Sequence, residues 1–123
     1  MAGSRGQNNI ALSDQFQLAD DAATTISTSS VGSSGILMIL GQNAIYNAVF
    51  GFRRAGGSEQ LQTLVLGTGV TNETTTDLTT GTANGTDGSV NVSVNGAGSG
   101  AIKVKNRTGG TLDMRIIVFS PQG

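Results

Sequence analysis

The chain has 123 residues, only 12% of them charged, a formal net charge of −1, and neither cysteine nor histidine. Disulfides are therefore excluded, and zinc, copper and haem sites lose their usual ligands. The balanced charge offers no basic footprint for nucleic acid and no polybasic patch for a membrane surface, so we predict no cofactor and neither of these partners.

The first 13 residues form a polar, Asn- and Gly-containing segment without the apolar run of a signal peptide. We interpret residues 1–13 as an N-terminal arm and residues 14–123 as a single domain. Arm residues Arg5, Asn8 and Asn9 are candidates for contact with a partner. A neighbouring subunit is the expected holder of this arm.

One or two early strands are predicted around Phe16, Leu18, Ala23 and Ile26, separated near Asp20 and Asp21. A Ser/Gly loop follows. The continuous apolar run at residues 35–40 then predicts a strand that is buried on both faces.

That apolar run places Ile36, Leu37 and Ile39 in the predicted core. A turn at residues 41–43 leads into an apolar segment at 44–52, so the two segments form a central hairpin. Residues 61–66 are the next strand.

Residues 67–88 are rich in Thr, Gly and Asn, and their only large apolar side chains are Val70 and Leu78. We predict a long loop that contains one short edge strand at residues 74–79. Because an exposed Thr-rich edge invites pairing, we expect a neighbour to cover it.

The last third of the chain alternates apolar and polar residues with the period of a half-buried strand. Three strands are predicted, joined by Gly- and Asn-rich turns, and they form an antiparallel meander. Their inward residues are Val90, Val92 and Val94, then Ile102 and Val104, then Leu112, Met114, Ile116 and Val118.

The whole chain thus reads as seven to nine strands without a sustained helical pattern. Turn signals recur about every 8–12 residues between the strands. This organisation predicts an all-β fold, an antiparallel β-sandwich of the jelly-roll type.

Catalytic arrangements are hard to build from these residues. Asp20 and Asp21 are adjacent, so in a strand they point to opposite faces and cannot share a proton. Residues 84–88 offer oxygen ligands without the carboxylate density of a calcium cage. We therefore predict that the protein is not an enzyme and holds no metal.

Lys103, Lys105 and Arg107 recur at period two and form a row on one strand face. This row is either a solvated face or an ionic contact with an acidic neighbour. Arg53 and Arg54, in a turn, have the same two interpretations. All five are candidates for partner binding.

Three stretches together resemble known phage modules: residues 18–26 (LADDAATTI), 84–92 (NGTDGSVNV) and 100–110 (GAIKVKNRTGG). They are similar to small virion proteins of tailed bacteriophages, namely capsid decoration (cement) proteins and the terminal domains of tail fibres. The resemblance implies a jelly-roll or related sandwich, commonly trimeric, with no catalytic residues to carry over.

From the resemblance we expect a structural virion protein, a homotrimer that docks on the major capsid protein and stabilises the head shell. It would be made in the bacterial cytoplasm and sit on the outer capsid surface. A chain that begins with its own Met and a short arm fits decoration better than a fibre end.

Two alternatives remain: a fibre or spike tip that binds a host glycan, and a free-standing lectin-like module. Tyr46 is the only tyrosine and there is no tryptophan, so an aromatic platform for sugar stacking is thin.

Overall fold

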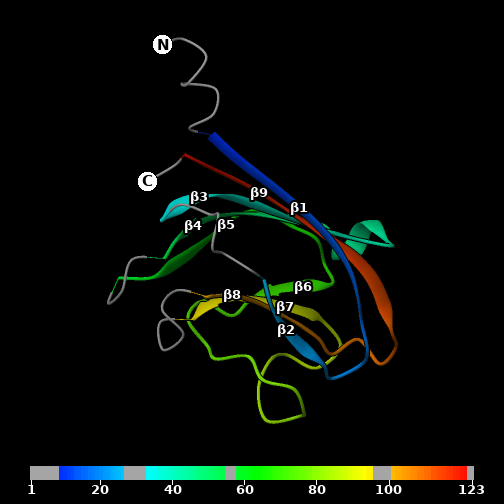
Figure 1. Ribbon diagram of the computed structural model, residues 1–123. Coiled ribbons are helices and arrows are strands. Elements are labelled where there is room, and N and C mark those ends of the chain that lie inside the picture. The colour runs from blue at the N-terminus through cyan, green and yellow to red at the C-terminus, as the bar shows by residue number, and fades with distance from the viewer. Residues whose placement is uncertain (1–8, 27–32, 55–57, 96–100, 122–123) are drawn as a thin grey trace, which may run out of the picture.

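The computed structural model describes residues 9–26, 33–54, 58–95 and 101–121, which fold into a two-layered sandwich (Figure 1). The elements in chain order are β1 (Asn9–Leu18), β2 (Ala23–Ile26), β3 (Ser34–Gly41), the short 3₁₀ turn η1 (Ala44–Tyr46), β4 (Ala48–Arg53), β5 (Gln60–Leu66), β6 (Val70–Asn72), β7 (Val90–Asn95), β8 (Ala101–Asn106) and β9 (Leu112–Pro121).

One layer is a five-stranded sheet in the order β1-β9-β3-β4-β5, antiparallel throughout. The other is a four-stranded sheet in the order β2-β8-β7-β6, in which only β6 and β7 run parallel. The predicted β-sandwich is thus confirmed.

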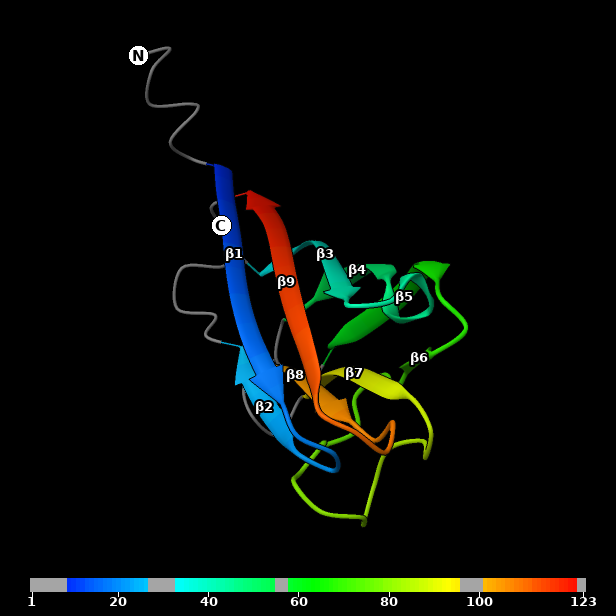
Figure 2. The same ribbon diagram turned by 90° about the vertical axis from the view of Figure 1, so that its right-hand side faces the viewer.

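The first strand pairs with the last in one sheet, and the second pairs with the eighth in the other. Jelly rolls share this nested pairing of the chain ends. The β3-β4-β5 meander and the parallel β6–β7 pair add a local departure from it. The long strands β1 and β9 lie side by side in both views (Figures 1 and 2).

The predicted meander of the last three strands is wrong in one respect. β7 and β8 do pair, but β9 leaves them and enters the five-stranded sheet between β1 and β3. The strand alternation says which side chains face the core and says nothing about which strand is the neighbour. Because β9 faces the same core from the opposite layer, its inward residues are unchanged.

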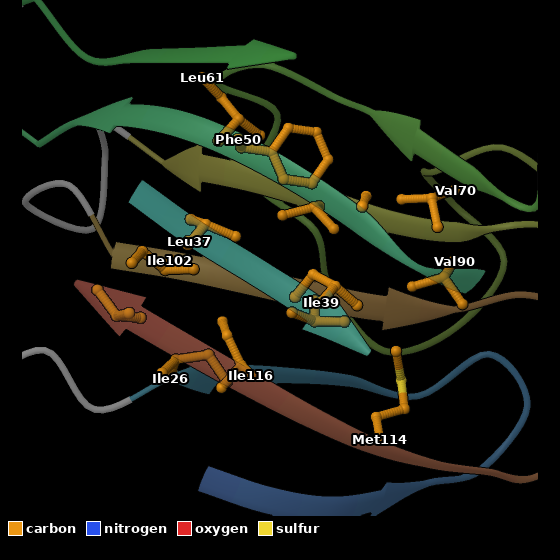
Figure 3. Packing of buried hydrophobic residues seen from close by; sticks show 14 of the residues in the cluster. Ile26, Leu37, Ile39, Phe50, Leu61, Val70, Val90, Ile102, Met114 and Ile116 are labelled. Carbon is orange, nitrogen blue, oxygen red and sulfur yellow. The ribbon is translucent and has the colours of Figure 1, made fainter. Parts of the chain in front are cut away.

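The core fills the space between the layers (Figure 3). Of the predicted core residues, Leu37, Ile39 and all nine from the last third of the chain are buried. Ile36 is the exception, with 37% of its surface exposed, because odd and even residues of β3 point to opposite faces of the sheet. The expectation that this strand is buried on both faces is therefore wrong.

Residues 73–88, which we call the covering loop, pass over the outer face of the four-stranded sheet. The predicted strand at 74–79 is wrong, since the short strand is β6, just before it. Leu78, a residue of this loop, is buried, with 1% of its surface exposed. Because no strand forms at 74–79, the exposed edge for which we expected a covering neighbour is not formed there.

The strand β1 begins at Asn9, whose register partner in β9 is Pro121. Residues 9–13, which we assigned to the arm, thus belong to the five-stranded sheet. The remaining arm residues, 1–8, lie outside the described residues, as does most of the predicted Ser/Gly loop.

Candidate interaction surface

The outer face of the five-stranded sheet carries apolar side chains in two cross-strand rows. The first row runs from Ile117 in β9 through Met38 and Val49 to Val65 in β5, each residue directly opposite the next. Residues directly opposite on neighbouring strands share one face of the sheet, so these four side chains adjoin.

The second row runs parallel to the first. It joins Phe119 in β9, Ile36 in β3, Gly51 in β4 and Gln62 in β5. Phe119 is 48% exposed, which is unusual for the largest apolar side chain on a sheet face. We call the two rows together the apolar face.

The sequence produces this face because β3 and β9 have apolar residues at both odd and even positions. In β9, Ile116 and Val118 are buried in the core, so Ile117 and Phe119 must point outward. Among the described residues, no segment comparable to the covering loop passes over this side of the sheet.

A depression of about 340 Å³ lies in the apolar face at Gly51. Its lining includes Ile36, Arg53 and Gln62. A Cβ atom at Gly51 would meet no described atom within 4 Å, so the absent side chain leaves open space. The face therefore has a half-exposed ring at Phe119 on one side of β3 and a hollow at Gly51 on the other side.

Polar side chains occupy the end of the sheet near the start of β9. Arg115 donates hydrogen bonds to Ser13 Oγ (2.7 Å) and to Gln15 Oε1 (2.9 Å), and Gln17 Nε2 donates to Asp113 Oδ1 (3.0 Å). A second depression, of about 260 Å³, lies beside Arg115. Polar side chains at the edge of an apolar centre are typical of a protein contact surface.

The predicted row of cations that starts on β8 lies on the opposite layer and pairs with residues of the same chain. Lys103 Nζ lies 2.6 Å from Asp77 Oδ1 in the covering loop, and Arg107 Nε donates to Asp21 Oδ1 at 3.0 Å. The acidic neighbour that we considered for this row is therefore supplied by the same chain.

Lys105 is fully buried, so the expectation that it faces water is wrong. The covering loop encloses it, and its Nζ donates to the Asn84 carbonyl oxygen (2.7 Å) and to Asn84 Oδ1 (3.1 Å). Burial is the main cause that lowers the pKa of Lys105. The positive charge of Arg107 lowers this pKa further, and Asp21 opposes the shift.

The other candidate contact residues divide between the apolar face and the undescribed arm. Arg53 is exposed and lines the hollow at Gly51. Arg54 is half-buried, and its backbone N–H donates to the Ser33 carbonyl oxygen. Arg5 and Asn8 lie outside the described residues, and Asn9 is known only by its backbone register.

Our sequence reasoning missed the apolar face as a site. The signal was present: Ile117 and Phe119 fall on the second face of their strand, as the alternation predicts. Ile36 was assigned to the core because an apolar run does not reveal which of its two faces is covered.

The described residues contain no cluster of three or more Asp or Glu side chains that could hold a metal ion. Among the same residues, no helix is long and apolar enough to cross a membrane. No protein-family model, no curated protein and no solved structure matches the chain.

Proposed function

We propose that the protein is a structural virion component, a decoration protein that docks as an oligomer on the outside of a phage head shell and clamps adjacent capsomers. The apolar face carries the oligomeric part of the proposal, because half-buried and exposed apolar side chains that adjoin on one face of a paired sheet suit contact with another copy of the protein. The phage context comes from the sequence resemblance. The proposal assigns no catalytic role.

The shape of the surface favours a protein partner over a small ligand. Small-molecule sites are concave and bury most of the ligand among converging polar groups. The apolar face instead extends across four strands, from Ile117 to Val65, and its hollow at Gly51 is shallow and open. A flat partner surface can cover both rows at once.

Such a protein would stabilise the shell by mass action. A partner that binds only the assembled shell stabilises it by an amount that grows with the logarithm of its concentration over Kd, about 2.7 kcal/mol at a hundredfold excess. Many copies acting at equivalent sites would add these contributions around the particle. No chemical step is needed.

Copy number per particle tests this role. Quantitative mass spectrometry of purified virions should give a stoichiometry comparable to that of the major capsid protein. A few copies per particle would instead favour a fibre or spike tip. Absence from particles would refute the structural role and favour a free-standing, lectin-like binding module.

The arm provides a second test of docking. Removing residues 1–8 leaves every paired residue of β1 in place, so the sandwich should keep its melting temperature. If the arm grips the shell or a neighbour, the truncated protein should bind purified capsids more weakly. Unchanged capsid binding would remove the arm from the mechanism.

A further inference from the structure

We propose that the apolar face binds the same face of a second copy of this chain. The two copies are related by a two-fold axis that lies between the two faces and runs parallel to β3. This pairing specifies the oligomer of the proposed function, yet its evidence lies in the sheet itself. It can therefore be tested on isolated protein, without virions.

The register of the second row carries the inference. Ile36 in the central strand has Phe119 directly opposite on one side and Gly51 directly opposite on the other. Neighbouring strands are about 4.8 Å apart, so Phe119 in β9 and Gly51 in β4 are equidistant from β3. A two-fold axis along β3 exchanges these positions, and each Phe119 ring is placed over Gly51 of the other copy.

Both contacts form together, since an isologous interface repeats each contact in the reverse direction. The ring of Phe119 is half exposed, whereas the depression of about 340 Å³ at Gly51 is open. Removing an aromatic ring from water into a fitting hollow is the kind of contact that dominates interface energetics.

The first row obeys the same symmetry. Met38 lies on β3, with Ile117 and Val49 directly opposite on its two sides. The axis therefore exchanges one apolar side chain for another, so the first row contains no charge, whereas Arg53 lines the hollow of the second row. The cations Arg53 and Arg115 lie outside both rows.

The area is sufficient for a specific contact. The whole five-stranded sheet, at about 4.8 Å spacing and about six residues in length, covers roughly 24 by 20 Å, or about 1,000 Å² over two copies, and the four strands of the apolar face make up about four fifths of that area. The value for the whole sheet lies at about the 1,000 Å² threshold of a biological interface and below the roughly 1,200–2,000 Å² of stable ones, so we expect a weak, reversible dimer.

A single flat face can meet only one other face, so the assembly closes as a dimer. A trimer, which the resemblance implied, would need two different surfaces on each copy. A trimer of this chain would have to use surfaces other than the apolar face alone.

A charge-complementation experiment tests the geometry. In the Gly51→Asp variant each hollow holds a carboxylate, and in the Phe119→Lys variant each ring becomes an ammonium. Gly51 faces open space and Phe119 is half exposed, so each variant should fold, which circular dichroism and thermal melting verify.

Sedimentation equilibrium should show that the unaltered chain dimerises and that each variant alone associates at least about tenfold more weakly, as expected for loss of an aromatic anchor. An equimolar mixture of the two variants should recover association. In the mixed dimer, one contact pairs Asp with Lys and the other retains Phe119 over Gly51.

The matched control is Ile45→Lys, which replaces an equally exposed apolar side chain outside both rows. Its dimerisation constant should stay within about twofold of the unaltered chain, because contacts outside the central anchors contribute little. The proposal is overturned if the unaltered chain stays monomeric up to its solubility limit. It is also overturned if the mixture fails to recover association or if Ile45→Lys weakens it equally.

These outcomes are separate from those of the proposed function. Virion stoichiometry tests the structural role whatever the geometry of the oligomer. Loss of charge complementation would remove the two-fold pairing and leave the decoration role standing.

Discussion

Asn106 lies where the chain crosses from one sheet to the other, and its replacement gives the sharpest test of how the layers are held together. Its fully buried Nδ2 donates to the carbonyl oxygens of Leu18 (2.8 Å) and Gly110 (2.7 Å). Its Oδ1 accepts from the backbone N–H (2.9 Å) and the hydroxyl (2.7 Å) of Thr108. One side chain thus connects the end of β1, the end of β8 and the turn into β9.

The Asn106→Asp substitution keeps the shape of the side chain, but it replaces the donating Nδ2 with a carboxylate oxygen that cannot donate. Two carbonyl oxygens then face a carboxylate oxygen, so two hydrogen bonds of about 1 kcal/mol each are lost. Burying the unpaired charge adds at least about 1 kcal/mol. We expect a loss of about 3 kcal/mol at pH 7, which lowers the melting temperature by about 10 °C for a chain of this size.

The loss should depend on pH with a defined sign. The facing carbonyls disfavour the carboxylate, so the pKa of the introduced Asp is higher in the folded state than in the unfolded state. Its protonated form can donate to one carbonyl. The deficit of the variant should therefore shrink as the pH falls below the folded pKa and grow as the pH rises through it.

Thermal melting by circular dichroism from pH 3.5 to 7 measures this deficit against the unaltered chain. Asn43→Asp is the matched control: Asn43 is exposed, its side chain makes no capping hydrogen bond, and the variant adds the same charge. A deficit at Asn106 that equals the control, or that stays constant across the pH range, would refute the reasoning.

Three further predictions concern the covering loop and the glycines. Folding should release a proton from Lys105, so the stability of the unaltered chain relative to Lys105→Met should rise from pH 7 to 10; Lys103→Met gives the reference slope in the same melts. Gly35→Ala should cost about 1–3 kcal/mol because its Cβ would collide with the backbone of β9, whereas Gly51→Ala, in open space, should gain about 0.5–1 kcal/mol in dilute protein. Leu78→Ala should cost about 2–3 kcal/mol and speed proteolytic cleavage of the covering loop, and an unchanged cleavage rate would show that this side chain does not hold the loop.

The candidate site could be predicted from the sequence only in part. Alternation in β9 correctly separated Ile116 and Val118 from Ile117 and Phe119, because side-chain direction follows from the strand period alone. The rows themselves depend on register across β3, β4 and β5. That register is set by pairing between segments far apart in the chain, which no local pattern specifies.

Lys105 and Ile36 were both misplaced, because each lies on the outer face of its sheet. We expected Lys105 to be exposed and found it buried, and we expected Ile36 to be buried and found it exposed. The covering loop crosses the face that bears Lys105 and encloses its ammonium, and nothing comparable among the described segments encloses Ile36. Burial at these positions depends on the path of a loop.

The sequence by itself determined the fold class, most of the strands along the chain, with β6 missed, and the inward residues of the last three strands. These follow from strand period, turn residues and composition, all of which act over a few neighbouring residues. Only the tertiary structure decided that β9 joins the opposite sheet, that the covering loop encloses one outer face, and that the other presents Phe119 beside the hollow at Gly51. The physical reason is that hydrophobic alternation selects a side of a strand, whereas its neighbour and its cover are selected by the packing of the whole chain.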